Sequence, residues 1–355
     1  MRVALLSPLF ESVPPRLYGG TERVVDWLSR GLIAAGHEVT LFASGDSRPH
    51  PGVELVAPIE KGIRLQNPPI QDALALHYRM MAMVGAQAGD FDIIHSHVDY
   101  WMLPLSLMKQ TPLVTTFHCR LDSHDLALAA SAFPDAAFTS VSDSQRTPLP
   151  GLNWVGTVRH GIPIEEMRFH PNPGSYLAFL GRIFPDKRPE WAIEIAHRSG
   201  VPLKIAAKIE GPQSQAYFDS CIRPHVDGKN VEYVGEISES EKNDFLGKAL
   251  ALVFPIDWPE PFGLVMIESL ACGTPVLARP FGAVPEVLRS GLTGFVDADI
   301  RELAQRVRDL DRISRARCRS WVEERFSIRR MTEDYIDVYR SLLGSRRARP
   351  RLVAG

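Results

Sequence analysis

The sequence predicts an α/β protein built from two consecutive units, each with a parallel β-sheet covered by helices. Three observations support this fold class. Short apolar runs alternate with amphipathic stretches, which is typical of parallel strands joined by helices. The alternation stops in a connector rich in turn residues at 160–174 and then begins again. The length of 355 residues fits about two domains of roughly 150 residues each.

The first half opens with a short buried strand at Val3–Leu6. Apolar residues between Val24 and Ile33 then recur at helical spacing. Gly36 is expected to end this helix before a strand at 38–43. The segment at 77–84 is typical of a helix with an apolar body, which serves either the core or a groove facing an acceptor or a membrane. Three further strands are expected at Ile93–His95, Leu113–Phe117 and Phe138–Val141.

The second half repeats the pattern. Its strands are expected at Tyr176–Leu180, Leu203–Ala207, Val231–Val234, Ala251–Pro255 and Pro275–Ala278. Its helices are expected at Ala192–His197, Glu268–Ala271, Glu302–Leu310 and Trp321–Leu343. We therefore expect one domain at 1–170, a second at 171–325, a C-terminal helix at 326–345 and a basic tail at 346–355.

Composition argues against several classes of protein. With 45% hydrophobic and 23% charged residues, the chain is expected to bury sizeable cores rather than to be disordered. The 40 basic and 42 acidic side chains nearly cancel, which argues against a nucleic-acid partner. No apolar run approaches the roughly 18–20 residues of a membrane span, and the first residues lack the longer apolar core of a signal peptide.

The cysteines and the charges near the C-terminus indicate where in the cell the protein is expected to be. The four cysteines lie far apart and form no CxxC pair, which predicts reduced thiols and a cytoplasmic protein. Four arginines fall between 346 and 351. They form either a solvated, frayed end or a weak peripheral contact with anionic lipid at the inner membrane face.

Two loops after predicted strands have the composition of a phosphate-binding site. Gly19 and Gly20 precede the first helix, where glycine allows close approach and the helix N-terminus offers N–H groups. A plain tight turn is the alternative, and the G-x-G-x-x-G pattern of nicotinamide-binding proteins is absent. In the second half, the guanidinium fork of Arg182 and the ammonium of Lys187 can converge on one pyrophosphate, or else lie in a solvated loop.

The most specific motif runs from Pro259 to Glu268. A helix is expected to begin near Phe262, with Glu260 before it and Glu268 nearly two turns inside. The apolar setting argues against two merely exposed carboxylates. The Glu268 carboxylate can accept two adjacent hydroxyls, as on a ribose. Backbone N–H groups at the helix start can meet phosphate oxygens or sugar hydroxyls, and they belong to Phe262, Gly263, Leu264 and Val265.

Histidines follow two of the first-half strands. His118 comes directly after Leu113–Phe117, and the carboxyl ends of parallel strands face the crevice in which α/β proteins bind ligands. A structural role is the alternative for this side chain. His95 and His97 are two positions apart, but the sequence places no third ligand beside them, so no metal site is predicted.

These segments together resemble the retaining glycosyltransferases of family 4, the glycosyl transferases group 1, which have the GT-B fold. The resemblance spans nearly the whole chain and includes five further stretches. These are Ser142-Asp143-Ser144, His160-Gly161-Ile162, Gly273-Thr274-Pro275-Val276, Gly282–Glu286 and Gly291–Val296.

The resemblance implies two Rossmann-like domains with parallel sheets that face each other across a cleft. The second domain would hold most of the donor, the first most of the acceptor, and the last helix would cross back to the first domain. Arg182 and Lys187 would hold the donor diphosphate and Glu268 the ribose hydroxyls. The Gly19-Gly20 loop would add an N–H group to the phosphate site.

For the transfer itself, the resemblance implies roles for His118 and Glu260 beside the sugar. It also implies that Arg182 and Lys187 stabilise the departing diphosphate in place of a metal, so no metal cofactor is expected. Two segments depart from the family pattern. Arg188 stands where the family often has Gly, and Ala206–Gly211 replaces a glycine-rich turn near the nucleotide base.

The implied activity is retaining transfer of a hexose-type sugar from a nucleotide-diphosphate sugar to a hydroxyl group. UDP-sugar is the first candidate donor and GDP-sugar the second. The acceptor is a saccharide, a lipid-linked acceptor or a small molecule. The alternatives are a nucleotide-sugar 2-epimerase of the same fold, a non-catalytic nucleotide-sugar binding protein and, with less support, a dinucleotide-dependent oxidoreductase.

Overall fold

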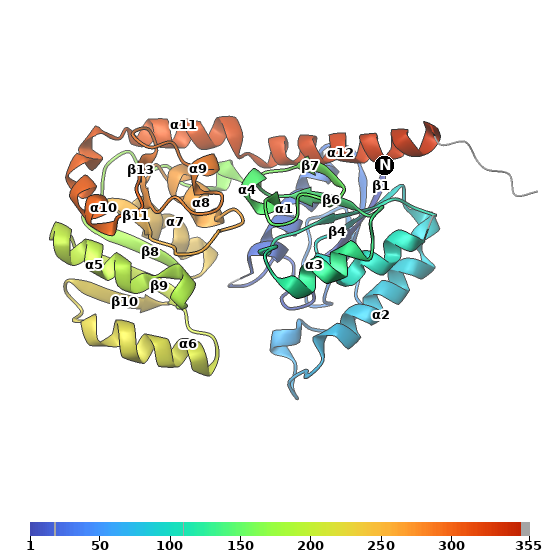
Figure 1. The fold of residues 1–355 in the computed structure, drawn as a ribbon, viewed down its shortest axis with the longest axis horizontal. Coiled ribbons are helices and arrows are strands. Elements are labelled where there is room, and N and C mark those ends of the chain that lie inside the picture. Colours follow the sequence, from blue (N-terminus) through green and yellow to red (C-terminus); the bar gives the residue numbers. More distant parts are fainter. Residues whose placement is uncertain (18, 109, 349–355) are drawn as a thin grey trace, which may run out of the picture. The chain divides into compact units, whose positions relative to one another are not determined.

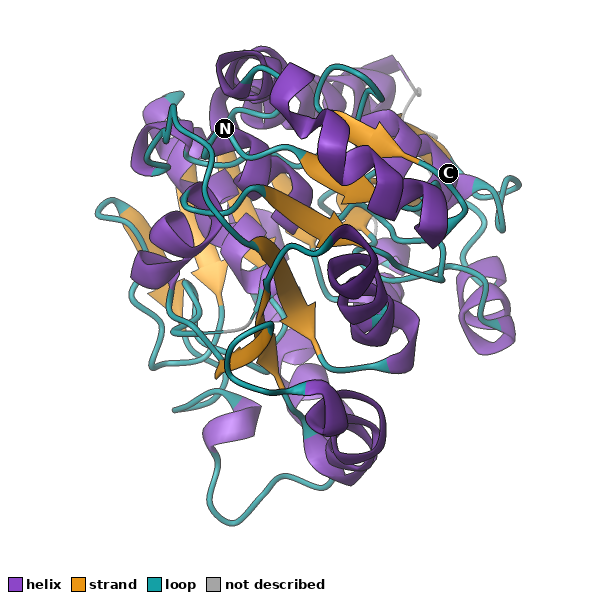
Figure 2. Cartoon of the chain, turned by 90° about the vertical axis from the view of Figure 1, so that its left-hand side faces the viewer, coloured by secondary structure: helices purple, strands orange, loops and turns teal. Residues whose placement is uncertain are grey.

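The computed structural model describes residues 1–17, 19–108 and 110–348, with side chains up to Gly344. The chain divides into two compact units. Unit 1 comprises Met1–Gly161 and the chain from Ile328 onward, and unit 2 comprises Ile162–Ser327. In both units helices flank a central sheet (Figures 1 and 2), so the predicted α/β class is confirmed.

Unit 1 contains a seven-stranded parallel sheet in the order β3-β2-β1-β4-β5-β6-β7. Its edge strands, β3 and β7, were not predicted. The strands are β1 (Arg2–Leu6), β2 (Glu38–Phe42), β3 (Val53–Val56), β4 (Ile93–Ser96), β5 (Leu113–Thr116), β6 (Ala137–Ser140) and β7 (Trp154–Thr157).

The helices of unit 1 are α1 (Gly20–Ala34), α2 (Ala73–Ala86), α3 (His124–Ser131), α4 (Asp143–Arg146) and α12 (Ile328–Ala348). Helices α2 and α3 of unit 1 contribute apolar side chains to hydrophobic clusters shared with strands of this sheet. In α2 the Asp72 carboxylate caps the first turn, and the side chains of His77, Met80 and Val84 are buried. This face of the predicted 77–84 helix therefore belongs to the core.

Unit 2 contains a six-stranded parallel sheet in the order β10-β9-β8-β11-β12-β13. Its strands are β8 (Leu177–Arg182), β9 (Leu203–Lys208), β10 (Val231–Gly235), β11 (Ala251–Phe254), β12 (Val276–Ala278) and β13 (Gly294–Val296). Its helices are α5 (Pro189–Ser199), α6 (Gly211–Tyr217), α7 (Glu239–Gly247), α8 (Leu264–Ala271), α9 (Val284–Val287), α10 (Ile300–Arg306) and α11 (Arg315–Arg325).

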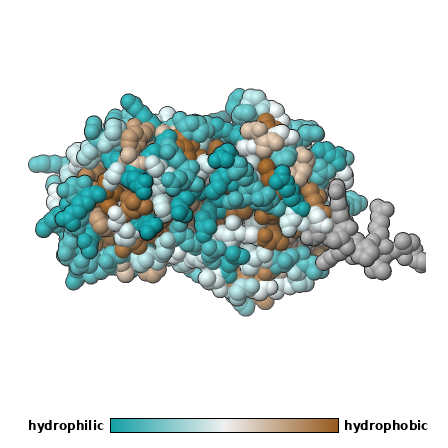
Figure 3. Space-filling model, turned by 90° about the horizontal axis from the view of Figure 1, so that it is seen from above, coloured by the Kyte–Doolittle hydropathy of each residue, from teal (hydrophilic) through white to brown (hydrophobic). Residues whose placement is uncertain are grey.

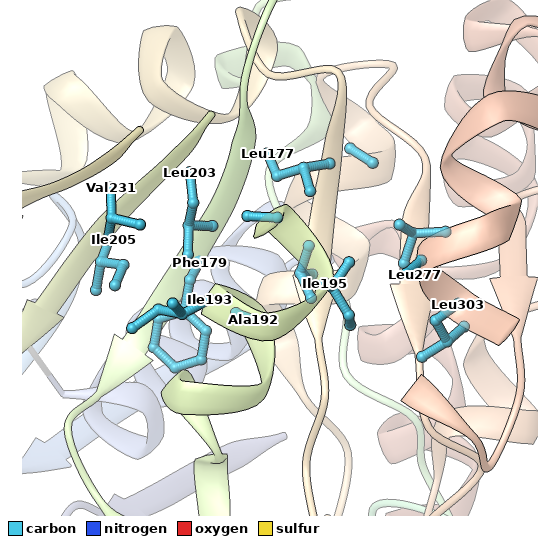
Figure 4. Close-up of a cluster of buried hydrophobic side chains, with 14 of the residues drawn as sticks. Leu177, Phe179, Ala192, Ile193, Ile195, Leu203, Ile205, Val231, Leu277 and Leu303 are labelled. Carbon is cyan, nitrogen blue, oxygen red and sulfur yellow. The ribbon is translucent and has the colours of Figure 1, made fainter. Parts of the chain in front are cut away.

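One hydrophobic cluster of unit 2 joins strands of its sheet with helices α5 and α10. Figure 4 shows side chains of β8, β9, β10, β12, α5 and α10 gathered in one cluster. Phe179 of β8 and Ile193 of α5 are both almost fully buried in it. This packing fixes the ends of the strands, and the loops that follow them carry the candidate site.

The boundary between the units differs from the predicted one. Residues 162–170 belong to unit 2 and not to the first domain. The Arg319 guanidinium donates hydrogen bonds to the carbonyl oxygens of Ile164 and Met167 at 2.9 and 2.7 Å. The backbone N–H of His170 donates to the carbonyl of Cys272 at 3.0 Å. These contacts hold the connector against unit 2.

The predicted helix at Trp321–Leu343 is two helices. Helix α11 ends at Arg325 and α12 begins at Ile328. The interruption arises because Ser327 forms an isolated β-bridge with Ile162, and the N–H of Ile162 donates to the carbonyl of Phe326. The chain thus passes from unit 2 to unit 1 between the two helices.

Hydrophilic residues predominate on the face shown in Figure 3, with smaller hydrophobic groups between them. Across the described ranges of the chain, none of the helices has the length and apolarity needed to cross a membrane. The side chains of the predicted basic tail at 346–355 lie outside the described residues.

Candidate active site

An ion pair joins two of the predicted site residues in unit 2. The Lys187 ammonium donates a hydrogen bond to the Glu260 carboxylate, and their side chains are only 13% and 12% exposed. Lys187 ends a short 3-10 turn that follows β8, and Glu260 lies in the loop between β11 and α8. The Lys187 nitrogen also lies 4.3 Å from the ring centre of Trp258, close enough for a cation–π interaction.

A close backbone contact fixes the position of Glu260. The N–H of Ala283 donates to the carbonyl of Glu260 at 2.9 Å. Gly282 has φ +60°, and a Cβ atom on it would meet the backbone O and N of Glu260 at 2.2 and 2.3 Å. Only glycine fits this approach, because a side chain would overlap the backbone of Glu260. The loop after β12 therefore sets the place of the carboxylate.

Helix α8 begins later than the sequence predicts. Gly263 adopts the left-handed conformation at φ +82° and directly precedes the helix, which starts at Leu264. Phe262 stays outside the helix and is buried, with its ring 5.9 Å from that of Phe326. Glu268 is therefore little more than one turn inside the helix, and not nearly two. The N–H of Met266 donates to the carbonyl of Gly263 at 3.0 Å. The first N–H groups of a helix, here those of Leu264 and Val265, have no acceptor within the helix and are therefore suited to an anion.

Glu268 has a partner that the sequence did not reveal. Its side chain is 5% exposed, and its Oε1 accepts a hydrogen bond from Nζ of Lys242 at 2.8 Å. Lys242 belongs to α7 and also pairs with Glu239 at 3.0 Å. The lysine compensates the charge of a carboxylate that would otherwise be buried alone. No local pattern joins α7 to α8, so the pairing could not be found from spacing.

The departure at Arg188 has a structural explanation. Arg188 adopts the left-handed conformation, with φ +51°, which costs a non-glycine residue roughly 1–2 kcal/mol. Its guanidinium pairs with Asp257 at 2.8 Å and lies 4.5 Å from the ring centre of Trp191. The N–H of Asp257 also donates to the carbonyl of Asp186 at 3.0 Å. These contacts offset the strain and tie the turn carrying Lys187 to the loop carrying Glu260.

Arg182 is the last residue of β8, and its guanidinium lies 6.0 Å from the ring centre of Phe184. It thus occupies the same end of the unit 2 sheet as the turn that carries Lys187. The remaining predicted residues, Gly19, Gly20 and His118, belong to unit 1.

The Gly19-Gly20 loop packs tightly at the start of α1. A Cβ atom on Gly19 would lie 2.6 Å from Cβ of Pro15, so a side chain does not fit there. In the first turn, burial raises the pKa of Glu22 to about 7, and the charge of Arg64 opposes this shift. The helix turn that follows the Gly19-Gly20 loop therefore contains a buried carboxyl group that can be protonated near neutral pH.

His118 is part of a histidine cluster at the carboxyl ends of β4, β5 and β7. Its Nε2 lies 2.8 Å from Nδ1 of His97, and its ring is stacked on that of His160 with centres 5.2 Å apart. Burial lowers the pKa of all three histidines, to about 3 for His118. The rings are therefore uncharged at neutral pH, and His118 is available as a neutral hydrogen-bonding group.

His95 has a structural role in the same cluster. Its two ring nitrogens bond to the hydroxyls of Tyr339 and Thr116, each at 2.7 Å. This network anchors α12 to β4 and β5. Within the part of the chain that the structure describes, no group of three or more His, Cys, Asp or Glu side chains is arranged to hold a metal ion.

Two Rossmann-like units with parallel sheets form the GT-B architecture of glycosyltransferases, and comparison with known proteins supports this class. The family model described as "Glycosyl transferases group 1" matches residues 164–323, and the model described as "Glycosyltransferase Family 4" matches residues 18–147. Both models describe glycosyltransferases, and together they match most of the chain.

Individual relatives extend the comparison over the full chain. The glycogen synthase of Mycobacterium tuberculosis is 28% identical over 94% of this chain and 91% of its own. The sucrose-phosphate synthase of Thermosynechococcus elongatus has a similar fold, with a TM-score of 0.80, 18% identity and coverage of 97% and 100% of the two chains. The HepE structure from Anabaena in complex with UDP-glucose has a TM-score of 0.75, 17% identity and coverage of 96% and 100%.

Proposed function

We propose that this protein is a retaining glycosyltransferase that moves a hexose from a UDP-sugar to an acceptor hydroxyl without a metal ion. The observation that carries the proposal is the Lys187–Glu260 pair next to the N-terminus of α8. It combines a cation for a diphosphate with a carboxylate for a sugar. The similar fold of HepE, solved with UDP-glucose, favours UDP over GDP as the nucleotide.

Each donor group has a counterpart among the residues of unit 2. Arg182, Lys187 and the first-turn N–H groups of α8 bind the diphosphate, because they supply positive charge and hydrogen-bond donors. Glu268 accepts the ribose hydroxyls, with Lys242 holding its carboxylate in place. Glu260 contacts hydroxyls of the transferred sugar.

The donor must compete for Lys187. In the structure this lysine is bonded to Glu260, so a bound diphosphate shares the ammonium with the carboxylate or replaces it. The pair keeps both side chains ordered before the donor arrives, which lowers the cost of arranging them on binding. We expect the Glu260 side chain to turn toward the sugar when the donor phosphate binds Lys187.

The reaction breaks the bond between the anomeric carbon and the diphosphate oxygen, and the electron pair leaves with the diphosphate. Arg182, Lys187 and the helix N–H groups stabilise the charge that develops on this leaving group. The acceptor oxygen bonds to the anomeric carbon on the face that the diphosphate left. The acceptor proton passes to a diphosphate oxygen, so configuration is retained and no protein base is needed.

Product analysis tests this function. The purified chain is incubated with UDP-glucose, then with UDP-galactose, and a panel of saccharide, lipid-linked and small-molecule acceptors. We expect UDP release that depends on the acceptor, and a glycoside with the anomeric configuration of the donor. A glycoside of inverted configuration would overturn the retaining mechanism.

The alternatives give different products. A 2-epimerase would change the sugar in the absence of acceptor and form no glycoside. A silent binding protein would bind UDP but release none from UDP-glucose. Running the panel with and without EDTA tests metal independence, because a metal-dependent enzyme would lose turnover in EDTA.

A further inference from the structure

One proton lies between His97 and His118 in unit 1, and the two rings do not by themselves show which of them carries it. Nδ1 of His97 and Nε2 of His118 are 2.8 Å apart, and either nitrogen can donate or accept. Because burial lowers the pKa of both rings, each is neutral and holds a single proton at neutral pH. Two arrangements remain: His97 donates from Nδ1, or His118 donates from Nε2.

The second ring nitrogen of His97 distinguishes these arrangements. Nε2 of His97 is buried and has no hydrogen-bond partner among the residues described by the structure. If His118 donated, His97 would carry its own proton on this Nε2 as a buried N–H without an acceptor. If His97 donates, Nε2 keeps only a lone pair. Buried N–H groups without partners are rarer than buried acceptors without donors, so donation by His118 is disfavoured.

Neighbouring rings hold both histidines in this orientation. The ring of His160 lies parallel to that of His118, with an interplanar angle of 11°. The ring of His95 lies 4.0 Å from that of His97 and is itself fixed by Tyr339. These contacts fix the plane of each imidazole.

We propose that His97 is a positioning residue that holds His118 in the tautomer with its proton on Nδ1. His118 then offers an N–H donor at Nδ1 and cannot accept a proton at that atom. The inference rests on the proposed function together with the family resemblance, which implies that His118 contacts the transferred sugar. It specifies that contact: the sugar must place an oxygen acceptor there, and a deoxy sugar at that position is a poor donor substrate.

Nitrogen-15 NMR of the full chain labelled at histidine tests the tautomer directly. His77 is an internal reference, because its Nε2 accepts from the backbone N–H of Leu9 and its Nδ1 faces the carbonyl of Ala73. Its proton must therefore lie on Nδ1. We expect His118 to show the same pattern as His77 at neutral pH. A proton on Nε2 of His118, on both nitrogens, or exchanging between them would overturn the inference.

Two substitutions at His97 test whether it sets the tautomer. His97→Leu removes the donor, whereas His97→Asn keeps an N–H near the place of Nδ1. We expect His97→Leu to alter the His118 signals and to lower kcat/KM for UDP-glucose about tenfold or more, at unchanged affinity for UDP. His97→Asn should recover most of the activity and the His118 pattern. Unchanged His118 signals in His97→Leu would contradict the proposal.

A matched control and a second readout separate this inference from the proposed function. His124→Leu changes an exposed histidine of α3 and should alter neither signal nor turnover. If His118 shows the expected tautomer but the chain does not turn over UDP-sugars, the proposed function fails while the assignment of the proton stands. If turnover is present but the tautomer is the other one, the inference alone fails.

Discussion

Replacing Gly282 with alanine should displace Glu260 and thereby disable the candidate site. The new Cβ would lie 2.2 Å from the carbonyl oxygen of Glu260, where real Cβ contacts are essentially never under 3.0 Å. The backbone of Glu260 must therefore move by about 0.8 Å or more. Because a shift of about 1 Å in a catalytic group can cost on the order of 100-fold in rate, we expect kcat/KM to fall about 100-fold.

The same substitution should also lower stability. An alanine in the left-handed region costs about 1–2 kcal/mol, and overpacking adds about 1–3 kcal/mol. Gly291→Ala is the matched control, because Gly291 has φ +80° but no other atom lies within 4 Å of the place that its Cβ would take. It carries the backbone strain without the overlap.

Thermal denaturation and steady-state kinetics of the two variants measure these effects. We expect both variants to have a lower Tm than the parent chain, with the larger decrease in Gly282→Ala, and only this variant to lose turnover. Equal turnover in the two variants would show that the contact with Gly282 does not position Glu260.

Three further predictions follow from the site. Glu22→Gln should stabilise the protein relative to the parent at pH 8 but not near pH 4.5. Because the pKa of Glu22 is raised to about 7 in the folded protein, the folded state binds one more proton than the unfolded state between pH 4.5 and about 7. The free energy of unfolding of the parent therefore falls by about 3 kcal/mol across this pH range. Denaturation of both chains across this range measures it, and a pH-independent difference would contradict it. Glu268→Ala should weaken UDP binding about tenfold or more in calorimetry, whereas Glu239→Ala, which removes the other carboxylate on Lys242, should not. Arg182→Ala should lower kcat about 100-fold at nearly unchanged Tm, in contrast to the surface control Arg198→Ala, and wild-type turnover would exclude Arg182 from the diphosphate site.

The central strands of both sheets were predictable because they are continuous apolar runs buried on both faces. Strands such as β4 and β11 agree with the predicted segments within a residue or so. The edge strand β3 was not found, because its half-exposed Val-Glu-Leu-Val segment carries a weaker pattern. The break before α12 was also missed, since it depends on a bridge to Ile162, far away in the sequence.

The site was predictable where its residues are close together in the chain. The Glu260 to Glu268 motif lies within one loop and one helix, so its spacing was informative. The exact start of α8 was not, because it depends on the left-handed conformation of Gly263. Contacts between residues that are distant in the sequence produce no pattern in it. Only the structure shows that Glu268 pairs with Lys242 and that Gly282 packs on Glu260.

The roles of the histidines also could not be predicted from their spacing in the sequence. Position after a strand singled out His118, and the His95–His97 spacing raised the question of a metal. The structure instead gives these two histidines different partners, Tyr339 for His95 and His118 for His97. Their roles depend on which strands are neighbours in the sheet, which spacing alone does not determine.

Nucleotide binding is the first measurement to make on the donor site proposed for unit 2. Calorimetric titration of UDP, GDP and ADP into the purified chain, each with and without EDTA, measures whether unit 2 holds a nucleotide diphosphate without a metal. We expect saturable binding that prefers UDP, is unaffected by EDTA and is weakened in Glu268→Ala. Folded protein that binds none of the three nucleotides would contradict the assignment of Arg182, Lys187 and Glu268 to a donor site.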